Sequence, residues 1–240
     1  MEINILLGEL FGTMILVLLG NGVVANCLLS ESKANGSGWM VISSGWAFAV
    51  LVGVFVALAF GAPAHINPAV TIGFAVSSGD FSNVIPFISA QFIGAFLGGL
   101  LVYLHFGPHW KATENAGLKL ACFSTGPAIR KTSANIISEA IGTFVLVLGV
   151  AAIFDSSGRV SDGLGPFLVA GLVWGIGLSL GGTTGYAINP ARDFAPRLVH
   201  AILPIPGKGS SDFAYSWIPV VGPIIGGVLA GLFIIFFPVF

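Results

Sequence analysis

The stretch Asn67-Pro68-Ala69 occurs once in the first half of the chain, and its second copy, Asn189-Pro190-Ala191, continues into Arg192-Asp193. Both copies follow irregular segments that lie within strongly apolar sequence. Asparagine is a favoured N-cap, and proline suits the first helical position because its missing N–H would have no partner there. Each copy therefore predicts a helix that begins abruptly, behind a polar cap, in apolar surroundings.

The composition is that of an integral membrane protein. Of the 240 residues, 55% are hydrophobic and 8% are charged, whereas a soluble domain carries about 25% charged residues. The mean hydropathy is +0.98, and the apolar runs are continuous, which favours helices over a β-barrel. A net charge of −1 gives no sign of a nucleic-acid partner. Cys27 and Cys122 match no metal-binding spacing, so we expect neither metal nor cofactor.

Six apolar segments are predicted to cross the bilayer, at about 3–29, 39–60, 83–106, 133–154, 165–180 and 213–237. The helices that begin at the two repeated motifs are expected to end near residues 76 and 200. A helix over 68–76 is only about 14 Å long, half of a hydrocarbon core of about 30 Å. The expected fold class is therefore all-α, with six transmembrane helices and two re-entrant half-helices. A short polar turn is expected at 155–162.

The two halves of the chain repeat each other. Glu9-x-x-Gly12-Thr13 matches Glu139-x-x-Gly142-Thr143 at an offset of 130, and Ile93-Gly94 matches Ile225-Gly226 at 132. Three spans per repeat is an odd number, so the second half must be inverted, and the half-helices would enter from opposite faces and meet near the midplane. We expect one domain, 1–240, built from inverted repeats 1–106 and 133–240 that an extramembrane loop, 107–132, joins.

Irregular backbone inside a bilayer is tolerated only where protein covers it or water lines it. The segments before the two asparagines would present two ladders of carbonyl oxygens, from Ala64, His65 and Ile66 and from Tyr186, Ala187 and Ile188. Each helix N-terminus adds a partial positive charge, about half an elementary charge, and Asn67 and Asn189 add amide donors. Such a path replaces part of the hydration of a neutral solute, repels cations and opposes a proton wire.

These features resemble the aquaporin, or major intrinsic protein, family over essentially the whole chain. The matching phrases are His65-Ile66-Asn67-Pro68-Ala69-Val70 and Ala187-Ile188-Asn189-Pro190-Ala191-Arg192-Asp193-Phe194. With Asp193 after the arginine, the second phrase resembles the glycerol-facilitator branch, the aquaglyceroporins, rather than strict water channels. The resemblance implies a passive channel for glycerol and similar polyols, with water, and a homotetramer with one pore per subunit. It also implies an integral protein of the cell membrane whose two termini are cytoplasmic.

The same resemblance implies a selectivity constriction on the extracellular side of the asparagines, made of Trp46, Gly177, Tyr186 and Arg192. A guanidinium with five fixed donors opposite two aromatic rings forms a slot with one polar and one apolar wall, which suits polyols. Gly177 leaves room for the second ring, where water channels usually have a histidine. Glycerol facilitators usually have phenylalanine at the position of Tyr186.

Several residues have a second interpretation. Glu9 and Glu139 are buried carboxylates that could carry protons, but their matched positions favour a structural role as acceptors for the amides of the two irregular loops. Arg192 could form a buried ion pair with Asp193 instead of facing a pore, although a charge within the membrane is a functional hypothesis by default. His65 could sense protons, or it could simply brace its loop.

Other functions stay open from the sequence. An ion-coupled secondary transporter also contains inverted repeats and broken helices, but apart from Glu9 and Glu139 the six spans hold almost no ionisable groups. A structural junction protein would conduct nothing. Within the channel class, undissociated lactic acid, dihydroxyacetone and urea are alternatives to glycerol. We expect no enzyme activity, because no nucleophile–base pair or metal cluster is apparent.

The basic residues are distributed against the expected orientation. With a cytoplasmic N-terminus, Arg159 would lie in a cytoplasmic loop, whereas cytoplasmic loops normally carry an excess of Lys and Arg. The basic residues that would lie outside are Lys33, Lys111, Lys119, Arg130, Lys131 and Lys208. The orientation is therefore expected from the family resemblance and not from charge.

Overall fold

The computed structural model describes residues 2–154 and 163–237, and these residues form helices and no strands. The expected turn at 155–162, which includes Arg159, lies outside the described residues. The long helices are α1 (Ile3–Leu28), α2 (Trp39–Ala59), α4 (Val84–His105), α7 (Thr132–Ile153), α8 (Gly165–Leu180) and α11 (Ile218–Phe236). The shorter helices are α3 (Pro68–Ser78), α5 (Gly107–Ala112), α6 (Ala116–Ala121), α9 (Pro190–Ile202) and α10 (Phe213–Ser216). The all-α prediction is confirmed.

Five segments are long and apolar enough to cross a bilayer, namely α1, α2, α4, α7 and the stretch Phe213–Phe236. The bounds predicted for the first four differ from the structure by one residue at most. The fifth predicted span, α8, has 16 residues, or about 24 Å of helix. Side chains such as Ile85, 74% exposed, and Leu104, 62% exposed, cover the outside of the molecule. An apolar surface of this kind suits a protein surrounded by lipid.

The structure adds detail that was not predicted in two segments. The loop expected at 107–132 contains α5 and α6, and Asn115 caps α6 by accepting hydrogen bonds from the N–H groups of Gly117 and Leu118. The last span is divided at Trp217 into α10 and α11. Pro219 explains the division, because it has no N–H to continue the helix and its ring crowds the preceding turn.

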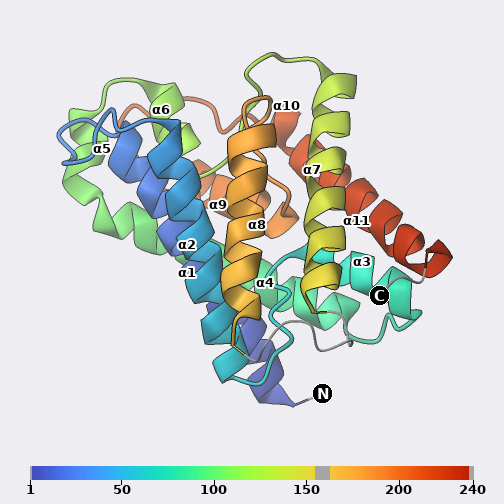
Figure 1. The fold of residues 1–240 in the computed structure, drawn as a ribbon. Helices are drawn as coiled ribbons and strands as arrows, with labels where there is room; N and C mark the ends of the chain where they lie inside the picture. The colour runs from blue at the N-terminus through green and yellow to red at the C-terminus, as the bar shows by residue number, and fades with distance from the viewer. Residues whose placement is uncertain (1, 155–162, 238–240) are drawn as a thin grey trace.

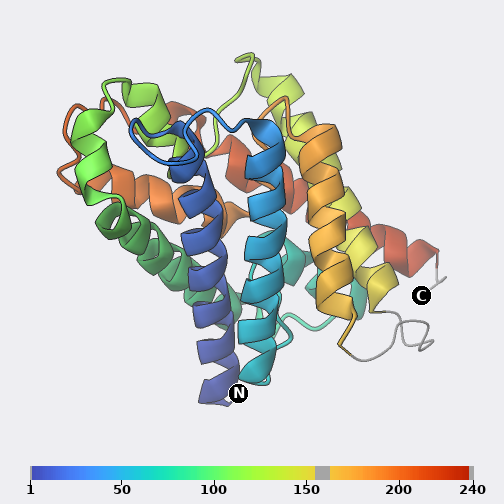
Figure 2. The same ribbon diagram turned by 60° about the vertical axis from the view of Figure 1, so that its left-hand side comes forward.

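The two halves of the molecule run in opposite directions. α1 rises from the N-terminus while α7 descends, and α2 descends while α8 rises (Figures 1 and 2). The packing follows the same symmetry, because α1 contacts α2 and α4 whereas α7 contacts α8 and α11. In addition, α4 packs on α9 and α11 packs on α3, so each half holds the short helix of the other.

Matched glycines allow the helices within each half to approach closely. A Cβ atom added to Gly94 would lie 2.1 Å from the carbonyl oxygen of Leu10, and one added to Gly226 would lie 2.2 Å from that of Ala140. These are equivalent contacts between α1 and α4 in the first half and between α7 and α11 in the second. Backbone contact of this kind, made possible by small residues, is the usual way in which helices pack in membranes.

The candidate pore

The two short helices meet at their N-termini. Asn67 caps α3 by accepting a hydrogen bond from the Ala69 N–H at 2.9 Å, and Asn189 caps α9 by accepting one from the Ala191 N–H at 3.1 Å. Each side-chain amide also reaches the opposite loop. The Asn67 Nδ2 donates to the Ile188 carbonyl at 2.8 Å, and the Asn189 Nδ2 donates to the Ile66 carbonyl at 2.9 Å. Each Nδ2 carries two hydrogens, so one remains on each asparagine after this exchange.

The backbone before each asparagine has an unusual and matched conformation. Ala64 and Ile66 have φ of 60° and 42°, three residues and one residue before Asn67. Tyr186 and Ile188 have φ of 37° and 44° at the equivalent places before Asn189. Positive φ is rare for a residue with a bulky or β-branched side chain. It costs about 1–3 kcal/mol per residue and persists only where the surrounding structure imposes it.

Two buried carboxylates hold these strained loops. Glu9 accepts hydrogen bonds from the N–H groups of His65 and Ile66 at 2.8 and 2.7 Å. Glu139 accepts hydrogen bonds from the N–H groups of Ala187 and Ile188 at 2.9 and 2.8 Å. Successive N–H groups gather on one side when right- and left-handed residues alternate, and this makes a concave site for an anion. Each glutamate therefore fixes the loop of its own half by two charge-assisted bonds.

A cavity of about 380 Å³ runs past the asparagines. Along α2 it is lined by Trp46, Val50, Val54 and Leu58. These side chains repeat every fourth residue and cover about 18 Å of the helix axis. The other predicted site residues that line the cavity are Ala64, His65, Ile66, Asn67, Tyr186, Ala187, Ile188, Asn189 and Arg192. The cavity thus has a polar strip from the two loops and an apolar wall from the spans.

The remaining predicted site residues lie outside the lining. Pro68, Ala69, Pro190 and Ala191 are buried in the first turns of α3 and α9. Gly177 is also absent from the lining, but a Cβ atom there would lie 2.9 Å from the Tyr186 ring, so the glycine makes room for that ring. Sequence reasoning missed the apolar wall, although the four-residue spacing on α2 was a readable signal.

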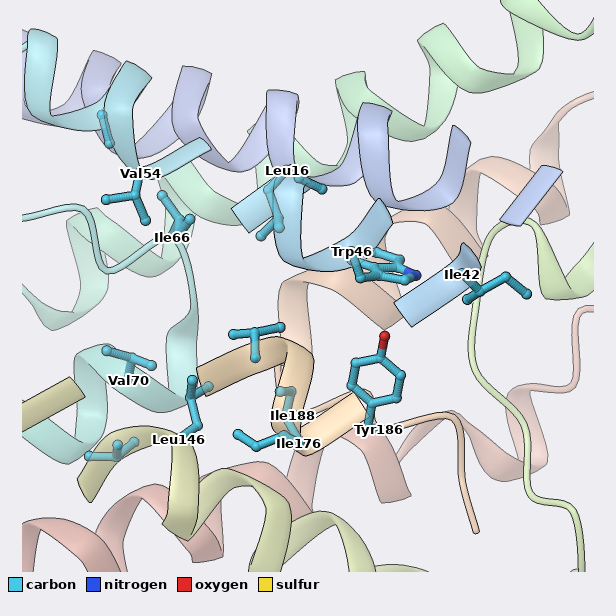
Figure 3. Close-up of a cluster of buried hydrophobic side chains, with 14 of the residues drawn as sticks. Leu16, Ile42, Trp46, Val54, Ile66, Val70, Leu146, Ile176, Tyr186 and Ile188 are labelled. Carbon is cyan, nitrogen blue, oxygen red and sulfur yellow. The ribbon is translucent and has the colours of Figure 1, made fainter. Parts of the chain in front are cut away.

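Two aromatic rings and a cation lie together on the lining of the cavity, from Trp46, Tyr186 and Arg192. The Arg192 guanidinium lies 4.0 Å from the centroid of the Trp46 ring, close enough for a cation–π interaction. The Tyr186 hydroxyl points toward Trp46 (Figure 3). Gly20 lies against the Trp46 ring, because a Cβ there would be 2.1 Å from it. The ring of Trp39 packs edge-on against the ring of Tyr186, with 5.7 Å between the two ring centroids. Sequence reasoning missed Gly20 and Trp39.

Asp193 pairs with Arg197 and not with Arg192. The Asp193 carboxylate accepts three hydrogen bonds from the Arg197 guanidinium at 2.9–3.1 Å. It accepts two more from Thr125, through its N–H and its hydroxyl, at 2.7 Å each. The alternative in which Arg192 is neutralised by Asp193 is therefore wrong. Within the described parts of the chain, no carboxylate lies within salt-bridge distance of Arg192. Its charge is thus left for the cavity.

The other end of α9 is also fixed in place. The Lys208 ammonium donates hydrogen bonds to the carbonyl oxygens of His200, Ala201 and Leu203 at 2.6–2.8 Å. A cation in this position satisfies the last carbonyl groups of the helix and complements its dipole. Lys208 and Asp193 together hold the helix that carries Arg192.

His65 is packed on the first loop. Its Nδ1 lies 3.1 Å from the Thr71 hydroxyl, and its ring contacts Phe74 and Phe87 at centroid distances of 5.4 and 5.6 Å. These contacts match a bracing role. Across residues 2–154 and 163–237, no cluster of His, Cys, Asp and Glu is arranged to hold a metal ion.

The fold and the site together define a membrane protein in which two short helices meet at their N-termini beside a cavity. A family model described as "Major intrinsic protein" matches residues 2–234. The chain belongs to the major intrinsic protein family, a family of membrane transport proteins.

Similar proteins include two bacterial relatives and one solved structure. The "Glycerol uptake facilitator protein" of Streptococcus pneumoniae is 58% identical over 232 residues, which cover 95% of this chain and 97% of the relative. The "Probable glycerol uptake facilitator protein" of Thermotoga maritima is 56% identical over 227 residues, which cover 94% and 96%. The aquaglyceroporin from Plasmodium falciparum has a TM-score of 0.84 at 27% identity and covers 97% of this chain and 95% of its own.

Proposed function

We propose that the protein is a passive channel for glycerol and similar small uncharged polyols, with water, and that it excludes ions and protons. The observation that supports this most is the reciprocal exchange of hydrogen bonds between the Asn67 and Asn189 amides and the opposite loops, on the wall of one cavity. The names of the bacterial relatives, which are glycerol uptake facilitators, point to the same solute.

In this proposal a solute passes between Arg192 and the rings of Trp46 and Tyr186, and then moves along the carbonyl ladders to the two asparagines. The loops accept hydrogen bonds from its hydroxyl groups while the apolar wall contacts its carbon atoms. The Arg192 charge and the two helix N-termini raise the energy of any cation on the path. Glu9 and Glu139 act as structural anchors and not as proton carriers.

We further propose the assembly and placement that the family resemblance implies. The chain would be one domain of two inverted repeats, 1–106 and 133–240, in a homotetramer with one pore per subunit. It would lie in the cell membrane with both termini in the cytoplasm. The exposed apolar side chains on the outside of the helices support contact with lipid and with other subunits.

Stopped-flow measurements on reconstituted protein test the function. We expect proteoliposomes to take up glycerol with a rate linear in its gradient and independent of sodium and proton gradients, well above that of empty liposomes. Dihydroxyacetone, urea and lactic acid belong in the same panel, with lactate flux followed over a range of pH. Uptake that collapses when an ion gradient is removed would contradict the channel, and equal rates in empty liposomes would indicate a non-conducting protein.

A further inference from the structure

The hydroxyl group of Tyr186 is a buried polar group without a protein partner. The side chain is 5% exposed and lines the cavity. No hydrogen-bond partner for the hydroxyl exists among the described residues. A buried hydroxyl left in this state is destabilising, and most such groups are satisfied by protein or by water. The cavity is therefore where its partner must come from.

The backbone of Gly177, which lies next to this hydroxyl, offers it no free acceptor. The Gly177 carbonyl accepts a hydrogen bond from the Trp39 indole N–H at 3.0 Å. Gly177 presents no side chain, and a Cβ atom there would lie 3.0 Å from the Tyr186 oxygen. Figure 3 shows that the hydroxyl points at the ring of Trp46, whose face carries the Arg192 guanidinium. The oxygen therefore lies in the slot through which a solute would pass.

We propose that the Tyr186 hydroxyl is a specificity-determining group that hydrogen-bonds to solute hydroxyls as they pass the constriction. The proposal rests on the proposed function and deepens it. A phenol donates one hydrogen bond and accepts others, whereas Arg192 only donates. A glycerol hydroxyl in the cavity can supply the hydrogen-bond partner that this oxygen lacks. A diol that lacks one of the glycerol hydroxyls leaves the Tyr186 oxygen without a partner during part of its passage through the constriction. The channel therefore favours triols over diols of the same carbon number.

Tyr186→Phe tests this, because it removes one oxygen atom and keeps the ring. The substitution has two effects of opposite sign on the ratio of glycerol to propanediol permeability. A wider slot raises the ratio, because glycerol is larger than propane-1,2-diol and propane-1,3-diol. Loss of the hydroxyl favours the diols, which no longer leave a polar group unpartnered. We expect the ratio of glycerol to propanediol permeability, corrected for diffusion through empty liposomes, to fall about fivefold to tenfold.

Tyr215→Phe is the matched control. Tyr215 is 1% exposed, and its hydroxyl also lacks a partner among the described residues, but it does not line the cavity. We expect this variant to keep the wild-type ratio. A change of less than threefold in Tyr186→Phe, a rise in the ratio, or an equal fall in Tyr215→Phe overturns the inference. Wild-type protein that passes no polyol at all overturns the proposed function as well, which distinguishes the two failures.

Discussion

Glu139→Gln is expected to abolish glycerol and water flux and to lower the free energy of unfolding by about 3 kcal/mol. The carboxylate accepts N–H bonds from both Ala187 and Ile188. A glutamine has one oxygen, so its amino group faces one of these N–H groups and that bond is lost. A hydrogen bond to a charged group is worth about 1.5–3 kcal/mol, and the unpartnered N–H adds its own penalty. The loop can then relax from the positive φ of Tyr186 and Ile188.

Two controls isolate the cause of this effect. Glu114 is exposed, so Glu114→Gln changes the net charge equally and should leave flux and melting temperature unchanged. Glu139→Asp keeps the charge but withdraws it from the loop, and it should be nearly as damaging as Glu139→Gln. Thermal unfolding in detergent and stopped-flow flux measure the two consequences. Wild-type flux in Glu139→Gln would mean that the carboxylate does not hold the path open.

Arg192→Ala is expected to let cations through the channel and to lower its selectivity for glycerol over water. A unit charge about 4 Å away raises the energy of a cation by about 4 kcal/mol at an effective dielectric constant of about 20. Removal of the guanidinium should therefore increase cation leak by about a hundredfold or more. The ratio of glycerol to water permeability should fall about tenfold, because the solute loses charge-assisted hydrogen bonds. Conductance and stopped-flow measurements on the same proteoliposomes check both effects.

Arg192→Lys separates charge from geometry. Lysine keeps the positive charge but not the planar fork of donors. We expect this variant to exclude cations as wild type does while its glycerol-to-water ratio falls. If glycerol and water rates stay unchanged in Arg192→Ala, the constriction has been assigned to the wrong place.

The sequence was enough to predict the features that depend on local chemistry. Long apolar runs gave the bounds of α1, α2, α4 and α7 to within one residue. Asparagine followed by proline located the N-termini of α3 and α9. The repeat around Glu9 and Glu139 pointed to two equivalent loops, because a buried carboxylate needs donors and the loops needed an acceptor.

Features that depend on distant partners could not be predicted. The left-handed conformation of Ile66 and Ile188 contradicts their local preference and exists because Glu9 and Glu139 impose it. Asp193 forms an ion pair with Arg197, four residues later in the chain. Thr125, which is distant in sequence, donates further hydrogen bonds to the same carboxylate. The hydrogen bond from Trp39 to Gly177 and the contact of Gly20 with Trp46 likewise form only once α1, α2 and α8 are packed.

The central claim is that solute travels through the cavity between the two asparagines, and a blocked cavity tests it most directly. Val173 on α8 lines the cavity and is 5% exposed, whereas Leu178 on the same helix is 42% exposed on the outside. The cavity of about 380 Å³ has room for an indole ring. Gel filtration first checks that both variants elute at the same volume as wild type. In stopped-flow assays, Val173→Trp should then reduce glycerol flux to the level of empty liposomes, whereas Leu178→Trp should conduct glycerol as wild type does. Wild-type glycerol flux in Val173→Trp would contradict the account.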